Sequence, residues 1–282
     1  MSKRNDILES VRKVPSLPVT TARVLALVQN PHTSVAALQQ EVELNPGLAS
    51  NILRLANSAY FRGAHPIASV RDALVRLGMK RVAQLVLTTS VEPLTRPAVS
   101  GYGLQSGGLF RHSAATAMAA EQLAGVLGME PPDHLYTAGL LHDLGKIVMG
   151  TFLEIDAEPI LKLAFDEGLS FERAERRILG VDHAEVGATL LATWEIPSSV
   201  VDVVRWHHEP EQFPGDDKTV VDVVHVADHM SRLSGTSAEA DGLNYELSAA
   251  SVERLGITPA ITERVIDEVL RTLDEICTSA RD

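Results

Sequence analysis

The stretch LLHDLGKIV, residues 140–148, decides how this chain is interpreted, because it places His142 and Asp143 side by side among leucine, isoleucine and valine. A buried imidazole and carboxylate need a compensating partner, since an unpaired buried charge is costly. A cation bound by both side chains would be such a partner. The stretch therefore predicts a metal-binding element inside an apolar helical core.

Other residues able to bind a metal lie before and after this stretch in the sequence, also among apolar and small residues. Eight of the ten histidines lie between residues 112 and 229, mostly in helical patterns with alanines nearby that let helices approach closely. Nitrogen and carboxylate ligands without thiolate favour one or two ions of iron or manganese, with nickel or zinc as alternatives, over calcium or magnesium. The candidate metal ligands are His112, His142, Asp143, His183, His207, His208 and Asp228.

Taken singly, each candidate also has an ordinary structural interpretation. His112 and His183 could be hydrogen-bonded core histidines, and His207-His208 could end a helix, where imidazolium interacts well with the dipole. Asp228 could cap a helix. Several such residues in one order are far less expected by chance than any one of them. The remaining histidines of this region are interpreted as surface or supporting residues: His134, His225 and His229.

The composition predicts a water-soluble helical protein. Of 282 residues, 45% are hydrophobic and only 4% aromatic, which suits packed helices better than a β-sandwich. A net charge of −12 disfavours nucleic acid and anionic membranes as partners. The only cysteine, Cys277, cannot form an internal disulfide, and no stretch approaches the ~18 apolar residues of a membrane span. We expect a cytoplasmic, all-α protein.

The amino-terminal half reads as amphipathic helices separated by short breakers. Asn30-Pro31, Asn45-Pro46-Gly47 and His65-Pro66 mark the breaks, and Ser34 is predicted to cap the following helix. Gly78 is predicted to interrupt a later one. No strand alternation is present. This half looks like a packing module rather than a site of chemistry.

Prolines and glycines crowd residues 93–108, which predicts a linker, and the small polar residues 234–244 predict a mobile loop. We therefore divide the chain into an amino-terminal lobe (1–98), a metal-binding lobe (99–235) and a loop with a carboxy-terminal helix (236–282). The helices expected after the linker cover residues 109–127, 135–152, 155–167, 171–178, 183–194, 197–207, 220–233 and 260–276.

The ligand order H…HD…H…HH…D resembles the HD phosphohydrolases, and in particular their HD-GYP subgroup. The amino-terminal segments VPSLPVTTARVLALVQNP, LQQEVELNPGLASNILRLANSAYF and SVRDALVRLGMKRVAQLVL resemble the HDOD domain of bacterial signalling proteins. The HDOD resemblance covers about residues 14–233. It implies two helical lobes, the carboxy-terminal one an HD-type bundle.

The resemblance also implies roles for the site residues. Asp143 would bridge two metals, with Lys146 binding phosphate. His112, His142 and Asp228 would complete one shell, and His183, His207 and His208 the other. Two departures from HD-GYP enzymes stand out: residues 210–219, PEQFPGDDKT, lack the GYP motif, which puts a cyclic dinucleotide in doubt, and Gly108 stands where some members carry a further acid.

Three functions remain open from the sequence. The first is a signalling module that binds metal and contacts a protein partner through its amino-terminal helices. The second is an active metal-dependent phosphohydrolase with Asp143 and Lys146 as catalytic residues and a nucleotide or other phosphate ester as ligand. The third is a scaffold with relic histidines. The complete ligand set argues against the third, and the missing GYP motif favours the first over the second.

Overall fold

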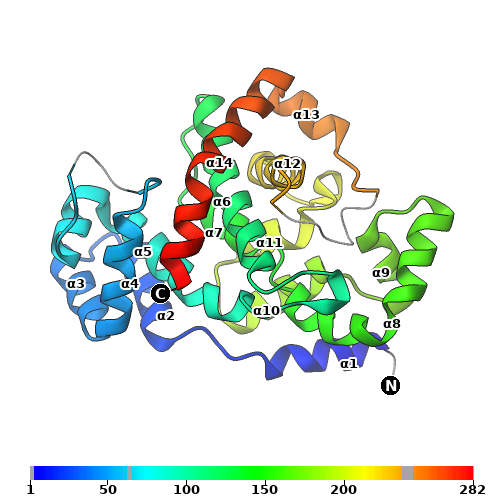
Figure 1. Ribbon diagram of the computed structural model, residues 1–282, viewed down its shortest axis with the longest axis horizontal. Helices are drawn as coiled ribbons and strands as arrows, with labels where there is room; N and C mark the ends of the chain where they lie inside the picture. The colour runs from blue at the N-terminus through cyan, green and yellow to red at the C-terminus, as the bar shows by residue number, and fades with distance from the viewer. Residues whose placement is uncertain (1–2, 62–64, 237–243, 282) are drawn as a thin grey trace. The chain divides into compact units, whose positions relative to one another are not determined.

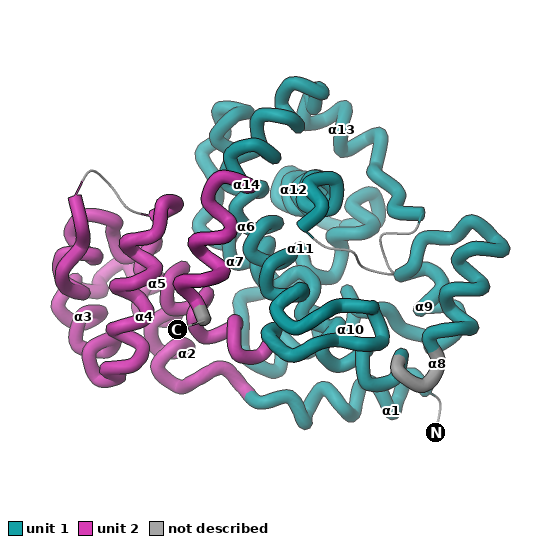
Figure 2. Tube along the Cα trace, in the orientation of Figure 1, with its two compact units in different colours: residues 1–15, 95–269 teal, residues 16–94, 270–282 magenta. Residues whose placement is uncertain are grey.

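The computed structural model describes residues 3–61, 65–236 and 244–281 (Figure 1). These residues form fourteen α-helices and no β-strand, which confirms the all-α prediction. The chain divides into two compact units, each assembled from two segments (Figure 2). Unit 1 comprises residues 1–15 and 95–269, and unit 2 comprises residues 16–94 and 270–282. The three-segment division at residues 98 and 235 stays a prediction.

Unit 2 contains two helices whose first turns are capped by a local side chain. The side chain of Ser34 accepts a hydrogen bond from the Ala37 amide at 3.2 Å, as predicted, and Asn45 caps the next helix in the same way. Gly78, with a φ of 86°, kinks the longest helix and confirms the predicted interruption. The helices are α2 Val19–Gln29, α3 Val35–Glu43, α4 Pro46–Ala56 and α5 Val70–Thr95.

Unit 1 is built around helix α6, which packs against both α7 and α12, while α10 packs against α8 and α11. The face of α6 toward its neighbours is rich in alanine, so the helices lie close together. The α-helices of this unit before the carboxy-terminal helix are α1 Lys3–Ser10, α6 Gly108–Val126, α7 Leu135–Leu141, α8 Lys146–Glu167, α9 Phe171–Leu179, α10 His183–Thr193, α11 Ser198–Trp206, α12 Thr219–Leu233 and α13 Ala249–Leu255.

The prediction of one continuous helix over residues 135–152 is wrong, because a turn divides this segment. Helix α7 ends at Leu141, the HD pair occupies a turn, and α8 then runs without a break to Glu167 instead of restarting at 155. Short-range turn bonds hold this bend: the Lys146 amide donates to the Asp143 carbonyl at 3.0 Å. The bend presents His142 and Asp143 at the meeting point of several helices.

Two connecting segments differ slightly from expectation. The linker predicted over 93–108 begins later, because α5 continues to Thr95, and it contains the 3₁₀ turn η2 Ser100–Tyr102. Residues 237–243 of the predicted loop over 234–244 lie outside the described residues. The last helix, α14 Pro259–Arg281, includes the predicted 260–276. Among the helices described, none combines the length and apolar character that a membrane crossing requires.

Candidate metal centre

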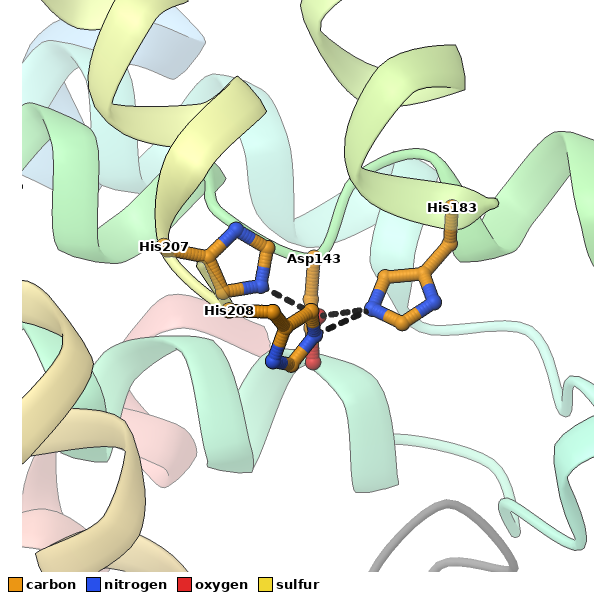
Figure 3. Close-up of side chains that lie close together, drawn as sticks. All are labelled: Asp143, His183, His207 and His208. Carbon is orange, nitrogen blue, oxygen red and sulfur yellow. Dashed lines mark hydrogen bonds and ion pairs between the residues drawn. The ribbon is translucent and has the colours of Figure 1, made fainter. Parts of the chain in front are cut away.

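The structure brings all seven candidate ligands together inside unit 1, in two groups. Within each group every residue offers one nitrogen or oxygen atom, and these atoms lie within 4.8 Å of one another. Figure 3 shows the group whose imidazoles surround Asp143. One group is His112, His142 and Asp228, and the other is Asp143, His183, His207 and His208. The members match the two shells implied by the resemblance, although their role as ligands stays a prediction.

Asp143 lies between the two groups and turns one oxygen toward each. Its Oδ2 lies 3.4 Å from Nε2 of His112 and 3.3 Å from Nε2 of His142. Its Oδ1 lies 3.4 Å from Nε2 of His183 and 3.8 Å from Nε2 of His207. This is the arrangement that a carboxylate shared by two cations would need.

A close approach of two helices makes this geometry attainable. A Cβ atom on Gly145 would lie 2.0 Å from the carbonyl oxygen of His183 and 2.6 Å from the Gly187 amide. Only glycine therefore lets the HD turn pack directly onto the first turn of α10. That contact sets the distance between Asp143 and His183.

Backbone carbonyls fix the ring orientation of two histidines. Nδ1 of His142 lies 2.8 Å from the Gly139 carbonyl oxygen, and Nδ1 of His207 lies 2.7 Å from that of Val204. A carbonyl can only accept, so the proton sits on Nδ1 in both rings. In the neutral form of each ring, Nε2 carries the lone pair, and this atom faces Asp143, where it could donate to a cation.

The electrostatics of the centre are strongly perturbed by burial and crowding. Burial alone would lower the pKa of His142, but the carboxylates of Asp143 and Asp228 outweigh it and raise that pKa to about 9. Burial and the nearby His142 lower the pKa of His207 to about 3. Although burial favours protonated carboxyls, the surrounding cationic groups hold the pKa values of Asp143 and Asp228 well below their usual range.

The residues fit a divalent metal. Among the described residues, four buried atoms of the centre have no hydrogen-bond partner: Nε2 of His142, Oδ1 of Asp143, Nε2 of His207 and Oδ2 of Asp228. Buried polar atoms are seldom left unsatisfied without a functional reason. Two of these atoms belong to each group, and a cation bound in each group would satisfy them. Mixed nitrogen and oxygen donors suit iron, manganese, nickel or zinc.

Lys146 lies at the edge of the same cluster. It is fully buried, and its Nζ lies 2.5 Å from Oδ2 of Asp143. Nζ also lies 5.4 Å from the centre of the Tyr102 ring. The side chain thus points toward the centre, as expected, and not toward solvent. Its role in binding phosphate stays a prediction.

Supporting residues around the centre were not singled out by the sequence patterns. Glu175 bonds to His183, Tyr102 bonds to Glu175, and Arg232 bonds to Asp228 at 3.1 Å. Tyr245 stacks with His225 and His229 and packs edge-on to His208. A signal existed for Glu175 alone: it follows Phe171 and precedes Leu179 by four residues each, which puts it on the apolar face of α9.

The remaining histidines between residues 112 and 229 either support the centre or lie apart from it: His134, His225 and His229. Nδ1 of His225 lies 2.7 Å from the carbonyl oxygen of His207, and its Nε2 accepts from the Ser248 amide at 2.9 Å. Both ring nitrogens of His225 are therefore occupied. His134 precedes α7 and His229 is half-buried beside Tyr245. None of these three belongs to the metal-binding groups found among the described residues.

Comparison with known proteins identifies relatives of this chain. The model of the HDOD domain family matches residues 14–210. The chain belongs to the HDOD family. A protein of Treponema pallidum without assigned function is 24% identical over 236 residues, which cover 80% of this chain but only 44% of that protein. This HDOD chain therefore spans less than half the length of that curated relative.

Solved structures share the fold. An HDOD domain protein of unknown function from Geobacter sulfurreducens superposes with a TM-score of 0.74 at 23% identity, covering 99% of this chain and 98% of its own. A candidate metal-dependent phosphohydrolase from Shewanella amazonensis gives a TM-score of 0.66 at 19% identity, covering 100% of both chains. At these identities the likeness establishes the HDOD fold, and the site must be argued from its own residues.

Proposed function

We propose that this HDOD protein is a signal-transduction module that holds a pair of divalent cations at the centre around Asp143. One observation supports the proposal: Asp143 turns one carboxylate oxygen toward each of the two groups of candidate ligands. His112, His142 and Asp228 would hold one cation, and His183, His207 and His208 the other. The same residues would link helices α6, α10 and α12 with the HD turn, so metal binding would be coupled to folding.

Burial of the centre favours a regulatory or stabilising role. Apart from His208, which is partly exposed, every candidate ligand is fully buried, and so is Lys146. A cation reaches such a site more readily than a bulky ester does. Metal binding would then set the stability of unit 1, which a signalling protein can use to change how it contacts a partner.

A partner protein is proposed for the helices of unit 2. Val19, Leu44 and Val75 expose 68, 67 and 70% of their surface, so this unit offers apolar side chains that a partner could cover. The double variant Leu44→Glu, Val75→Glu should lose the signalling phenotype in cells while keeping its metal content and melting temperature. A full phenotype in that variant would argue against a partner on these helices.

A specific observation supports a second candidate, a metal-dependent phosphohydrolase. The ammonium group of Lys146 lies beside the shared carboxylate, where it could bind a phosphate oxygen as a point charge. Cations held by the two groups would activate a water molecule as the nucleophile and neutralise charge on a phosphoryl group. The substrate would then be a nucleotide or another phosphate ester small enough to reach the centre.

One experiment separates the two candidates. The purified full chain is analysed for metal by mass spectrometry and then incubated with bis(p-nitrophenyl) phosphate and added Mn²⁺ or Fe²⁺. Bound metal without turnover is expected of the signalling module. Bound metal with turnover that Asp143→Ala abolishes would establish the hydrolase instead. A chain that binds none of iron, manganese, nickel and zinc would contradict both.

A further inference from the structure

Helix α9 carries no candidate metal ligand, yet it contacts the centre through a buried carboxylate. Glu175 is fully buried, and its Oε2 lies 2.8 Å from Nδ1 of His183. The same oxygen accepts from the backbone amide of His183 at 3.0 Å. Two contacts to one residue fix both the position of the main chain and the plane of the ring.

This contact distinguishes His183 from two other histidines of the centre. The Nδ1 atoms of His142 and His207 face neutral backbone carbonyls, whereas that of His183 faces a carboxylate. A carboxylate behind a ligating imidazole fixes the tautomer and makes the opposite nitrogen a better donor than a carbonyl does. Nε2 of His183, the opposite atom, lies 3.4 Å from Oδ1 of Asp143.

The carboxylate of Glu175 is itself held from behind. The hydroxyl of Tyr102 donates to Oε1 of Glu175 in a short hydrogen bond. The Tyr102 ring lies edge-on to the His183 ring, with 5.9 Å between centres, and against Phe171. Tyr102 is completely buried, so this arrangement is locked by packing.

The neighbouring residue on α9 secures the start of the helix that carries His183. Arg176 forms an ion pair with Asp182, whose other oxygen accepts from the Glu185 amide at 2.8 Å and caps α10. Arg176 also bonds Glu209, directly after His208, at 2.8 Å. Helix α9 therefore supports two ligand-bearing segments at once.

We infer that Glu175, held by Tyr102, is a positioning residue that orients His183 and strengthens its Nε2 as a metal ligand. The inference rests on the proposed metal centre and adds a carboxylate to it that binds no metal itself. Loss of the negative charge at Glu175 should weaken binding at the group of Asp143, His183, His207 and His208. The group of His112, His142 and Asp228 should be affected less.

The variant Glu175→Gln isolates this effect. A glutamine of the same shape can still accept from His183 with its oxygen. Its amide group would donate to the Tyr102 hydroxyl oxygen, so the bond to Tyr102 reverses direction while the contact stays in place and the negative charge is lost. Glu172→Gln is the matched control, because Glu172 is a buried carboxylate on the same helix that bonds Ser170 instead of a histidine. If Glu175→Gln does not fold, Tyr102→Phe is measured in its place. This variant keeps the ring but removes the hydroxyl that holds Glu175, and it should weaken the same metal-binding step.

The test is titration of the metal-free full chain with Co²⁺ alone, followed by visible absorption and calorimetry. The wild type and Glu172→Gln should bind Co²⁺ in two steps with the same affinities and bands. In Glu175→Gln one step should weaken by about 10–100-fold and its bands should shift. Unchanged affinity and bands in folded Glu175→Gln would overturn this inference alone. A wild type that binds no Co²⁺ would overturn the proposed centre as well.

Discussion

Nζ of Lys146 lies 2.5 Å from Oδ2 of Asp143, with both side chains fully buried. The same oxygen is within 3.4 Å of His112 and His142, so the ammonium occupies the side of Asp143 that faces one ligand group. A lysine in this position neutralises the carboxylate and also presents a positive charge to any anion that reaches the centre. The two roles predict different effects of replacing Lys146 on the affinity for phosphate.

If Lys146 binds phosphate, replacing it should affect anion affinity and not metal content. In the metal-loaded protein, Lys146→Met is expected to weaken binding of inorganic phosphate by about tenfold or more, equal to about 1.4 kcal/mol. Calorimetric titration with phosphate measures this. Lys162→Met, on the exposed side of the same helix, is the control. Equal phosphate affinity in all three proteins would assign Lys146 to neutralising Asp143 only.

Asp143 should couple metal binding to stability. A ligand at a hundred times its Kd adds about 2.7 kcal/mol to the free energy of unfolding. We therefore expect the metal-loaded wild type to melt several degrees higher than the same protein in EDTA, and Asp143→Ala to melt at one temperature in both. Differential scanning calorimetry provides the comparison. An EDTA effect of equal size in the variant would mean that Asp143 is not a ligand.

Gly145 should be intolerant of any side chain. Because the added Cβ of Gly145→Ala would overlap the His183 carbonyl, we expect the free energy of unfolding to fall by about 1–3 kcal/mol and metal affinity to fall with it. Gly125→Ala is the matched control. That glycine lies exposed in α6 with open space around its Cβ, so alanine should stabilise by about 0.5–1 kcal/mol. Equal stability of the two variants would refute the close approach.

Much of the fold follows from local signals. Ser34 and Asn45 begin their helices because their side chains satisfy free amides of the first turn, and this chemistry is visible in a few consecutive residues. The gathering of the seven candidate ligands could be anticipated too, because their residue types recur in one order within sequence patterns typical of helices. The order of histidines and aspartates along the chain was the basis of that prediction.

The HD turn could not be predicted in the same way. Leu140, Leu144 and Ile147 continue a helical spacing straight through it, so periodicity alone favours an unbroken helix. The bend depends on contact between Gly145 and α10, some forty residues later in the chain. Tyr102 shows the same limit: it lies in a segment rich in glycine, and only the folded structure brings it to Glu175.

Anomalous diffraction would show whether two cations lie on either side of the Asp143 carboxylate. Crystals of the full chain grown with Mn²⁺ or Fe²⁺ would be measured above and below the absorption edge of that metal. We expect two anomalous peaks, one beside each carboxylate oxygen of Asp143, each within coordination distance of the histidines of its group. A map without a peak at Asp143, from crystals soaked at saturating metal, would contradict this expectation.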